Sequence, residues 1–240
     1  MYPILNIGPA IIPTAPLLLI IGLYLSLSVV ERAAKMLGLA AVQIYEVCAN
    51  ALIAGFLLAR LAFVAAHWDS FRAAPLSIIW PLNSGYMISA GVVGGLLILI
   101  GSIYRAKLPV RPTISALLPA ILTLFLFISL SDFIARPAAG TITTIPWAIE
   151  SVGLSRHPIE LYEIGVAILG LIVWWWMARE QPERAFWLTI VVYGFGRFFI
   201  DAFRSNAPVL SSGYHIIQLL LLPLVLFAIY RLFPVVETTG

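Results

Sequence analysis

Charged residues are scarce in this chain, and their scarcity excludes an ordinary soluble protein. They make up 10% of the 240 residues, whereas an average soluble domain carries about 25%. Hydrophobic residues account for 62%, and the mean hydropathy is +1.03. The composition therefore predicts an all-α integral membrane protein, with no room for a sizeable soluble domain beside its spans.

The sequence also lacks the residue patterns of several kinds of site. Cys48 is the only cysteine, which excludes an intramolecular disulfide and leaves no cysteine spacing for a metal. No serine or cysteine stands beside a histidine as a nucleophile, no phosphate-binding loop occurs, and no basic cluster is suited to nucleic acid. We therefore expect no metal, no cofactor and no nucleic-acid partner. Any chemistry must use arginine, histidine, tyrosine and carboxylate groups on a bound substrate.

Apolar segments of membrane-spanning length are abundant. A helix needs about 20 residues to cross the hydrocarbon core of a bilayer. The first basic residue is Arg32, so the chain lacks the n-region of a cleavable signal peptide and its first apolar segment is expected to remain a span. We expect a single polytopic membrane domain over 1–240. Its transmembrane helices, about seven in number, are predicted at 10–30, 41–66, 84–104, 113–135, 159–178, 185–204 and 213–232.

Basic residues are distributed unevenly over the predicted loops. With the N-terminus outside, eight would lie on the cytoplasmic side: Arg32, Lys35, Arg105, Lys107, Arg111, Arg179, Arg184 and Arg231. Four would lie on the opposite side: Arg72, Arg136, Arg156 and Arg204. Cytoplasmic loops of membrane proteins are enriched in lysine and arginine. We therefore predict an N-terminus outside and a C-terminus in the cytoplasm.

Arg197 lies inside the apolar segment 185–204. A guanidinium at the centre of a bilayer costs about 2.5–3.5 kcal/mol on insertion scales, so such a residue is usually paired and usually functional. Helical periodicity places four polar residues of this segment on one face: Tyr193, Arg197, Asp201 and Arg204. This cationic stripe predicts a site for an anionic group that is reached from within the membrane.

The string Arg156-His157-Pro158-Ile159-Glu160-Leu161-Tyr162-Glu163 marks the start of the fifth predicted helix. Pro158 suits the first turn, and glutamates are favourable at the positive end of the helix dipole. Two interpretations are open. The string is either a capped helix start with an interfacial tyrosine, or a proton-handling or lipid-headgroup site made of His157, Glu160 and Glu163.

Two further features of the predicted spans have alternative interpretations. Arg60 is a second cation within a span, and it either snorkels to the interface or contributes to a site. The small residues between Ser84 and Gly95 provide either close helix packing or room for a lipid headgroup or acyl chain. Packing is the preferred interpretation, because it is the commoner use of glycine in membrane helices.

Together these strings resemble the prolipoprotein diacylglyceryl transferase family of seven-helix bacterial membrane enzymes. The resemblance extends over nearly the whole chain, and the Arg-His-Pro-x-x-Leu-Tyr-Glu string is its most specific part. The matching residues are Pro3–Pro9, Ala59-Arg60-Leu61 with Phe63-Val64, Arg156-His157-Pro158 with Leu161-Tyr162-Glu163, Tyr193-Gly194 with Arg197-Phe198 and Arg204, and Gln218.

The resemblance implies a function and a set of site residues. The family transfers a diacylglyceryl group from phosphatidylglycerol to a lipobox cysteine thiol and releases glycerol phosphate. A multi-pass transferase of the bacterial plasma (inner) membrane is thus implied, with the lipid bilayer, phosphatidylglycerol and a prolipoprotein signal peptide as partners. The implied catalytic residues are Arg197, Tyr193, Asp201 and His157, with Asp201 standing where the family usually has glutamate. The lipid phosphate would be bound by Arg197, Arg60, Arg204, Arg136 and Arg156, supported by Glu160, Tyr162, Glu163 and Gln218.

The chain departs from the family's pattern in the third and fourth helices. Ala90 stands where the family has a histidine, Ser129 where it has an arginine, and Pro137 where it has a glutamate. Arg136 lies seven residues beyond Ser129. That separation is about 10 Å along a helix, so Arg136 is not a geometrically equivalent replacement.

These departures leave three functions to compare. An active diacylglyceryl transferase is preferred. The alternative is a non-catalytic paralogue that binds anionic lipid or a lipoprotein signal helix, which the substitutions at Ala90 and Ser129 favour. A transporter or channel is disfavoured, because the sequence shows no internal repeat and few polar residues at mid-membrane depth.

Overall fold

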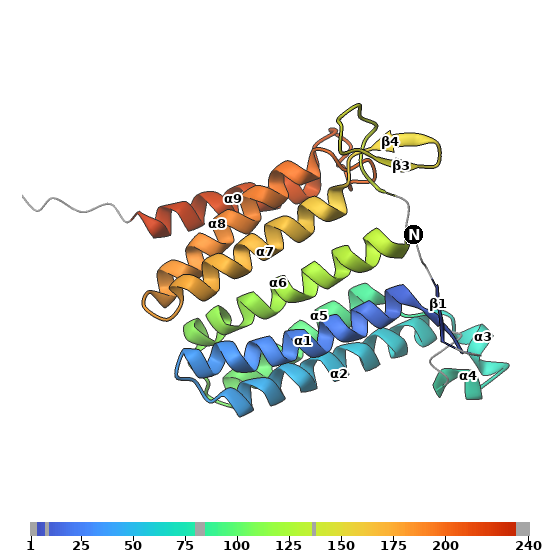
Figure 1. Ribbon diagram of the computed structural model, residues 1–240. Coiled ribbons are helices and arrows are strands. Elements are labelled where there is room, and N and C mark those ends of the chain that lie inside the picture. The colour runs from blue at the N-terminus through green and yellow to red at the C-terminus, as the bar shows by residue number, and fades with distance from the viewer. Residues whose placement is uncertain (1–3, 8–9, 80–84, 136–137, 234–240) are drawn as a thin grey trace, which may run out of the picture. The chain divides into compact units, whose positions relative to one another are not determined.

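The computed structural model describes residues 4–7, 10–79, 85–135 and 138–233, and these residues are predominantly helical (Figure 1). The long helices are α1 (Thr14–Met36), α2 (Ala41–Ala66), α5 (Ile88–Arg105), α6 (Val110–Ala135), α7 (Ile159–Met177), α8 (Pro182–Asp201) and α9 (Ile216–Leu232). The shorter elements are the helices α3 (Trp68–Arg72) and α4 (Leu76–Ile79) and the strands β1 (Ile4–Ile7), β2 (Ala10–Pro13), β3 (Ile149–Ser151) and β4 (Leu154–Arg156).

Several of these helices are suited to a membrane. Within the described residues, five are long and apolar enough to span it: α1, α2, α5, α6 and α7. The apolar helix α9 has 17 residues, and the 20-residue helix α8 carries charged side chains at both ends. The chain is therefore a predominantly helical, multi-pass membrane protein. The count of seven spans and the orientation of the termini stay predictions.

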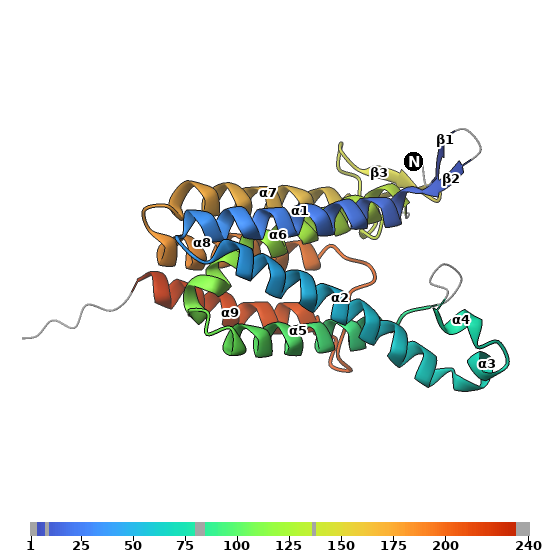
Figure 2. The same ribbon diagram turned by 90° about the horizontal axis from the view of Figure 1, so that it is seen from below.

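The predicted spans overlap the long helices, with two informative differences. The segment 185–204 was expected to be helical to its end, but α8 ends at Asp201, so Arg204 lies beyond the helix and the prediction that it continues the helical face of Arg197 was wrong. The other difference is at the N-terminus. The segment 10–30 was expected to be helical throughout, but Ala10–Pro13 form β2, which pairs antiparallel with β1. Helix α1 begins at Thr14. Figure 2 shows α1 directly after the β1–β2 hairpin. Pro13 is extended (φ −63°, ψ 126°) and Pro16 occupies the first turn, an arrangement typical of a helix start. The prolines therefore set the beginning of α1 later than hydropathy predicts.

The chain divides into two compact units, one made of residues 1–38 and 114–240 and the other of residues 39–113. Each has its own close-packed helices. The prediction that 1–240 form one membrane domain stays a prediction.

In the second unit, α2 and α5 approach closely through small residues. A methyl group added at Gly91 would lie 2.8 Å from the backbone oxygen of Gly55 and 2.7 Å from Ala59 Cβ. One added at Gly95 would lie 3.2 Å from the backbone oxygen of Ala51. Only very small side chains permit this separation of two helices. The packing interpretation of the small-residue segment is thereby confirmed at these two glycines.

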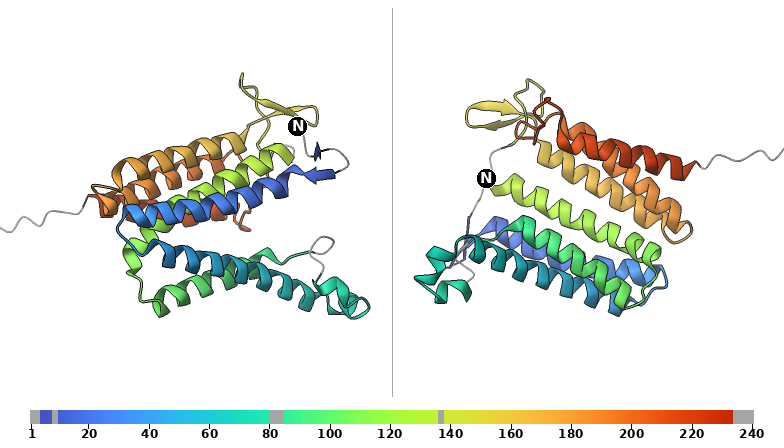
Figure 3. Two further views of the ribbon diagram at one scale, coloured as in Figure 1. Left: turned by 60° about the horizontal axis from the view of Figure 1, so that its bottom comes forward. Right: turned by 180° about the vertical axis from the view of Figure 1, so that it is seen from behind.

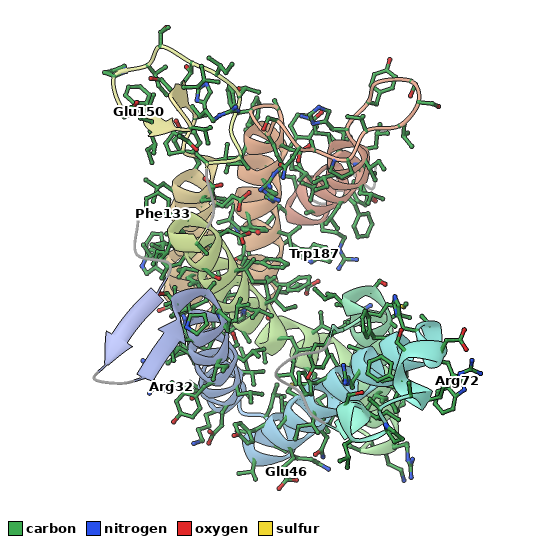
Figure 4. The ribbon with its side chains drawn as sticks, turned by 90° about the vertical axis from the view of Figure 1, so that its right-hand side faces the viewer. Arg32, Glu46, Arg72, Phe133, Glu150 and Trp187 are labelled. Atoms are coloured by element: carbon green, nitrogen blue, oxygen red, sulfur yellow. The ribbon has the colours of Figure 1, made fainter. Side chains whose placement is uncertain are left out.

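In the first unit, α7, α8 and α9 run side by side (Figures 1 and 3). Two glycines of α8 face opposite neighbours: a methyl added at Gly196 would lie 2.6 Å from Val166 of α7, and one at Gly194 would lie 2.7 Å from Val225 of α9. At the other end of α8, Trp187, which is labelled in Figure 4, packs edge-on against Phe227 of α9. The polar end of α8, which begins at Arg197, is therefore held directly between two helices.

The segment between α6 and α7 folds onto the residues that follow α8. Strands β3 and β4 form an antiparallel hairpin, and Glu150 of this hairpin is exposed (Figure 4). Backbone hydrogen bonds join Thr141 to Phe203 (2.8 Å) and Ser205 to Ala139 (2.9 Å). These bonds bring the start of α7 and the end of α8 together.

Candidate functional site

A carboxylate and two guanidinium groups meet in the first unit, near the start of α7 and the end of α8. Arg197 donates from Nη1 to Oε1 of Glu163, and Arg204 donates from Nη2 to the same oxygen. Ser129, on α6, donates to Oε2 of Glu163 at 2.7 Å. The exposed fraction is 11% for the Glu163 side chain and 19% for each arginine side chain. We refer to Ser129, Glu163, Arg197 and Arg204 as the arginine cluster.

The fold explains why these four side chains meet. Arg197 lies on the part of α8 that its glycines allow to approach α7, and Glu163 lies near the start of that helix. Arg204 follows the end of α8, where its backbone forms a β-bridge with Gly140. A charge removed from water needs a partner, and Glu163 supplies one to both guanidinium groups.

The arginine cluster has an excess of positive charge. Two guanidinium groups and one carboxylate leave one formal positive charge, and Arg204 Nε is buried without a hydrogen-bond partner among the described residues. Buried donors of this kind are rare and call for an explanation, such as a bound group. The cluster is therefore chemically suited to an anion with one negative charge.

Tyr193 lies one helical turn before Arg197, on the same face of α8. Its ring stacks on Phe125 of α6, with centroids 5.8 Å apart and an interplanar angle of 13°. Phe125 precedes Ser129 by one turn, so the same faces of α6 and α8 meet at both positions. The predicted site residue Tyr193 thus lies beside the arginine cluster.

Asp201, also predicted for the site, is bound by a residue that sequence reasoning missed. Its side chain is fully buried, and Oδ2 lies 2.8 Å from Nδ1 of His215. His215 immediately precedes α9 and keeps 24% of its side chain exposed. The available sequence signal was a histidine at the predicted start of the last helix. Nothing in the local sequence paired it with an aspartate on α8.

The side chains of the Arg156–Glu163 segment have two different roles. Glu163 joins the arginine cluster, whereas Glu160 is buried and its Oε1 accepts the backbone N–H of Ala139 at 3.1 Å. Arg156 donates to the backbone oxygen of Gly140 at 3.0 Å. These two side chains therefore anchor the segment between α6 and α7.

His157 and Tyr162 anchor the same segment through their rings. Trp147 donates from Nε1 to the Tyr162 hydroxyl at 2.8 Å, and His157 Nδ1 lies 3.4 Å from that hydroxyl. The His157 ring also packs on Phe203, with centroids 4.7 Å apart. The Tyr162 hydroxyl thus links the start of α7 to the loop that contains Trp147.

Gln218 joins the two helices that flank this region. It donates from Nε2 to the backbone oxygen of Phe198 at 3.1 Å, one residue beyond Arg197. The last predicted phosphate ligand, Arg136, lies outside the described residues. Among those residues, no group of three or more histidine, cysteine, aspartate or glutamate side chains is placed to hold a metal.

Arg60 lies in the second unit and binds backbone carbonyl groups. It donates from Nε to Ile78 and from Nη1 to Gly85, both at 3.0 Å, and from Nη2 to Ser77. Its guanidinium carbon also lies 5.1 Å from the ring centroid of Phe71 and 5.6 Å from that of Tyr86. Arg60 therefore fixes the segment between α2 and α5, and its predicted role in lipid binding stays a prediction.

Known proteins are similar in sequence to this chain over most of its length. The profile of the family described as prolipoprotein diacylglyceryl transferase matches residues 3–233. The chain belongs to this family. Curated relatives named phosphatidylglycerol–prolipoprotein diacylglyceryl transferase include one from Geobacter sulfurreducens, 29% identical over 230 residues, which cover 89% of this chain and 86% of that relative. The resemblance seen in the sequence is thereby confirmed.

Two further relatives bear the same name. The one from Clostridioides difficile is 28% identical over 206 residues, covering 81% of this chain and 79% of the relative. The one from Enterococcus faecalis is 26% identical over 230 residues, covering 89% and 82%. The similarity therefore includes both units of the chain.

Ser129 is one of the positions where the chain departs from the family's pattern. From the resemblance we expected an arginine at this position, and the serine hydroxyl lies in the arginine cluster, where it donates to Glu163. The residue that departs from the family's pattern thus contacts the same carboxylate as Arg197 and Arg204.

Replacing Arg60 by methionine removes every donor while keeping a long apolar side chain. Hydrogen bonds to a charged group contribute roughly 1.5–3 kcal/mol to stability. We therefore expect the free energy of unfolding to fall by an amount of that size, and the segment between α2 and α5 to be cleaved faster by protease. Arg105→Met, at an exposed position of α5, is the matched control. Thermal unfolding in detergent and limited chymotrypsin digestion would measure both. Equal behaviour of the two variants would contradict the anchoring role.

Replacing Glu163 by glutamine leaves two nearly buried guanidinium groups without their carboxylate. Removing one partner of a buried ion pair costs roughly 3–5 kcal/mol, so the unfolding midpoint should fall well below that of the exposed control Glu150→Gln. An anionic lipid should recover part of the loss in Glu163→Gln, because its phosphate can take the place of the carboxylate. Thermal unfolding in detergent with and without added phosphatidylglycerol would measure both effects. A variant as stable as the control would show that the cluster does not depend on Glu163.

Proposed function

We propose that this protein transfers the diacylglyceryl group of phosphatidylglycerol to the lipobox cysteine of a prolipoprotein signal peptide, in the bacterial inner membrane. The observation that carries the proposal is the arginine cluster, in which two nearly buried guanidinium groups share one carboxylate. Membership of a family whose curated relatives are named for this reaction supports it.

The charge of the cluster fits the lipid substrate. A phosphodiester such as phosphatidylglycerol carries one negative charge, which equals the excess positive charge of Arg197, Arg204 and Glu163. Arg204 Nε is a buried donor without a partner within the described part of the chain. We assign the lipid phosphate to this position, with Tyr193 lining it one turn before Arg197.

The reaction adds charge where the arginines lie. The thiolate sulfur attacks the glyceryl carbon that bears the phosphate ester, and a sulfur–carbon bond forms as the carbon–oxygen bond breaks. The phosphate oxygen leaves with the bonding electrons, so negative charge on the phosphate grows in the transition state. Guanidinium groups fixed beside it then stabilise the transition state more than the bound lipid, which is the requirement for catalysis.

The other predicted residues hold this site in place. Arg156, His157, Glu160 and Tyr162 anchor the loop between α6 and α7, and we assign them a positioning role. Gln218 fixes α9 to α8 beside the cluster. Arg60 and Arg136 stay candidates for lipid binding on the basis of the sequence alone.

A second candidate function is a non-catalytic protein that binds an anionic lipid or a lipoprotein signal helix. The observation in its favour is Ser129, a neutral side chain at the position where the resemblance expects a second essential arginine. Release of glycerol phosphate separates the two candidates, because binding alone produces none.

The test is turnover of phosphatidylglycerol by the purified protein in detergent with a lipobox peptide. We expect peptide-dependent release of glycerol phosphate and a loss of about 10²–10³-fold in kcat for Arg197→Ala, the usual effect of removing one donor to developing charge. Arg184→Ala, exposed near the start of α8, is the control and should retain activity.

Saturable lipid binding without release would favour the second candidate. Turnover that Arg197→Ala leaves unchanged would contradict the assignment of the phosphate to the arginine cluster.

A further inference from the structure

A histidine–aspartate pair lies beside the arginine cluster. His215 and Asp201 lie 2.8 Å apart, between Nδ1 of the imidazole and Oδ2 of the carboxylate. Asp201 is fully buried and His215 is partly exposed. The Asp201 carboxylate is therefore shielded from solvent, whereas part of the His215 side chain is accessible to it.

The hydrogen bond fixes which nitrogen of the imidazole carries the lone pair. An ionised carboxylate only accepts hydrogen bonds, so the Nδ1–H group of His215 donates a hydrogen bond to Oδ2 of Asp201 and keeps its proton. The neutral ring then has its lone pair at Nε2, which has no partner among the described residues. An imidazole oriented by a buried carboxylate through Nδ1 is the arrangement in which histidine acts as a general base in serine hydrolases.

The backbone holds His215 in this position. Ile216 donates to the backbone oxygen of Pro208 at 3.0 Å, Leu210 donates to that of Tyr214 at 2.9 Å, and Val209 and His215 form a β-bridge. The loop between α8 and α9 therefore reverses on itself and presents His215 at the start of α9. A side chain held by its loop and by Asp201 loses little further freedom when a substrate binds.

The pair lies close to the arginine cluster because both depend on α8. Asp201 follows Arg197 by four residues, one helical turn or about 6 Å along the axis. Gln218, three residues after His215 in the first turn of α9, donates to the backbone oxygen of Phe198 and fixes α9 at this level of α8. The other histidine of this region, His157, has a tyrosine hydroxyl and not a carboxylate beside its Nδ1.

We propose that His215, positioned by Asp201, is the general base that takes the proton from the acceptor thiol. This inference rests on the proposed transferase function. The thiol proton moves to Nε2 of His215, and the resulting thiolate attacks the glyceryl carbon while the phosphate oxygen leaves at the arginine cluster. Asp201 keeps its negative charge and stabilises the imidazolium. The imidazolium then releases its proton to water, which restores the neutral ring.

The test compares two lipobox peptides, one with cysteine and one with selenocysteine as the acceptor. A selenol is more acidic than a thiol and is ionised at neutral pH, so it needs no base. General base catalysis contributes about 10²–10⁴-fold, and His215→Gln should lose that much in kcat with the cysteine peptide but less than about tenfold with the selenocysteine peptide. Asp201→Asn should show the same selective recovery.

Two variants serve as controls. Ser212→Ala, an exposed position in the same loop, should match the wild type with both peptides. Arg197→Ala should be impaired with both, because the leaving phosphate is the same. The glutamine amide of His215→Gln can still donate to Asp201, so the variant should keep the fold, which its unfolding midpoint would show.

The outcomes separate this inference from the proposed function. Suppose that the wild type releases glycerol phosphate. If His215→Gln is then unimpaired, or is equally impaired with both peptides, the base assignment is wrong and the transferase function stands. No glycerol phosphate from the wild type with either peptide would overturn both. Selective recovery with selenocysteine supports both.

Discussion

The interaction on which the site depends is the pairing of Glu163 with Arg197 and Arg204. A guanidinium among apolar helices is stable only with a partner, and here one carboxylate serves two of them. The pairing joins α7 to α8 and to the segment beyond it, and it leaves a positive charge in excess. The contacts with Glu163 therefore stabilise the two arginines within the protein, fix the positions of their guanidinium groups and leave one positive charge that can bind an anion.

Other contacts in the first unit position Glu163, Arg197 and Arg204 so that they can pair. Gly194 and Gly196 let α8 lie against both neighbouring helices, and the loop between α6 and α7 is anchored by Arg156 and Glu160. These contacts determine where the start of α7 and the end of α8 meet, and hence where the arginine cluster forms.

The sequence predicted the parts of this arrangement that depend on local periodicity. The long helices and the polar face of α8 follow from hydropathy and from a spacing of three or four residues, and Arg197 stood out because it interrupts an apolar segment. Contacts between distant segments were not predictable in this way. The pairing of Asp201 with His215 spans a loop, and the division of the string between Glu160 and Glu163 depends on which helix each side chain faces. Arg60 was recognised as an intramembrane cation, but its carbonyl partners lie 17 to 25 positions away, in the short helix α4 and just before α5.

The central claim is that the arginine cluster binds the phosphate of the lipid. The most direct measurement is a structure of the protein crystallised from a lipidic phase doped with phosphatidylglycerol carrying a sulfur atom on its phosphate, located by anomalous scattering. The account predicts the sulfur signal beside the guanidinium groups of Arg197 and Arg204, next to Tyr193. A signal elsewhere, with both arginines still bound only to Glu163, would contradict it.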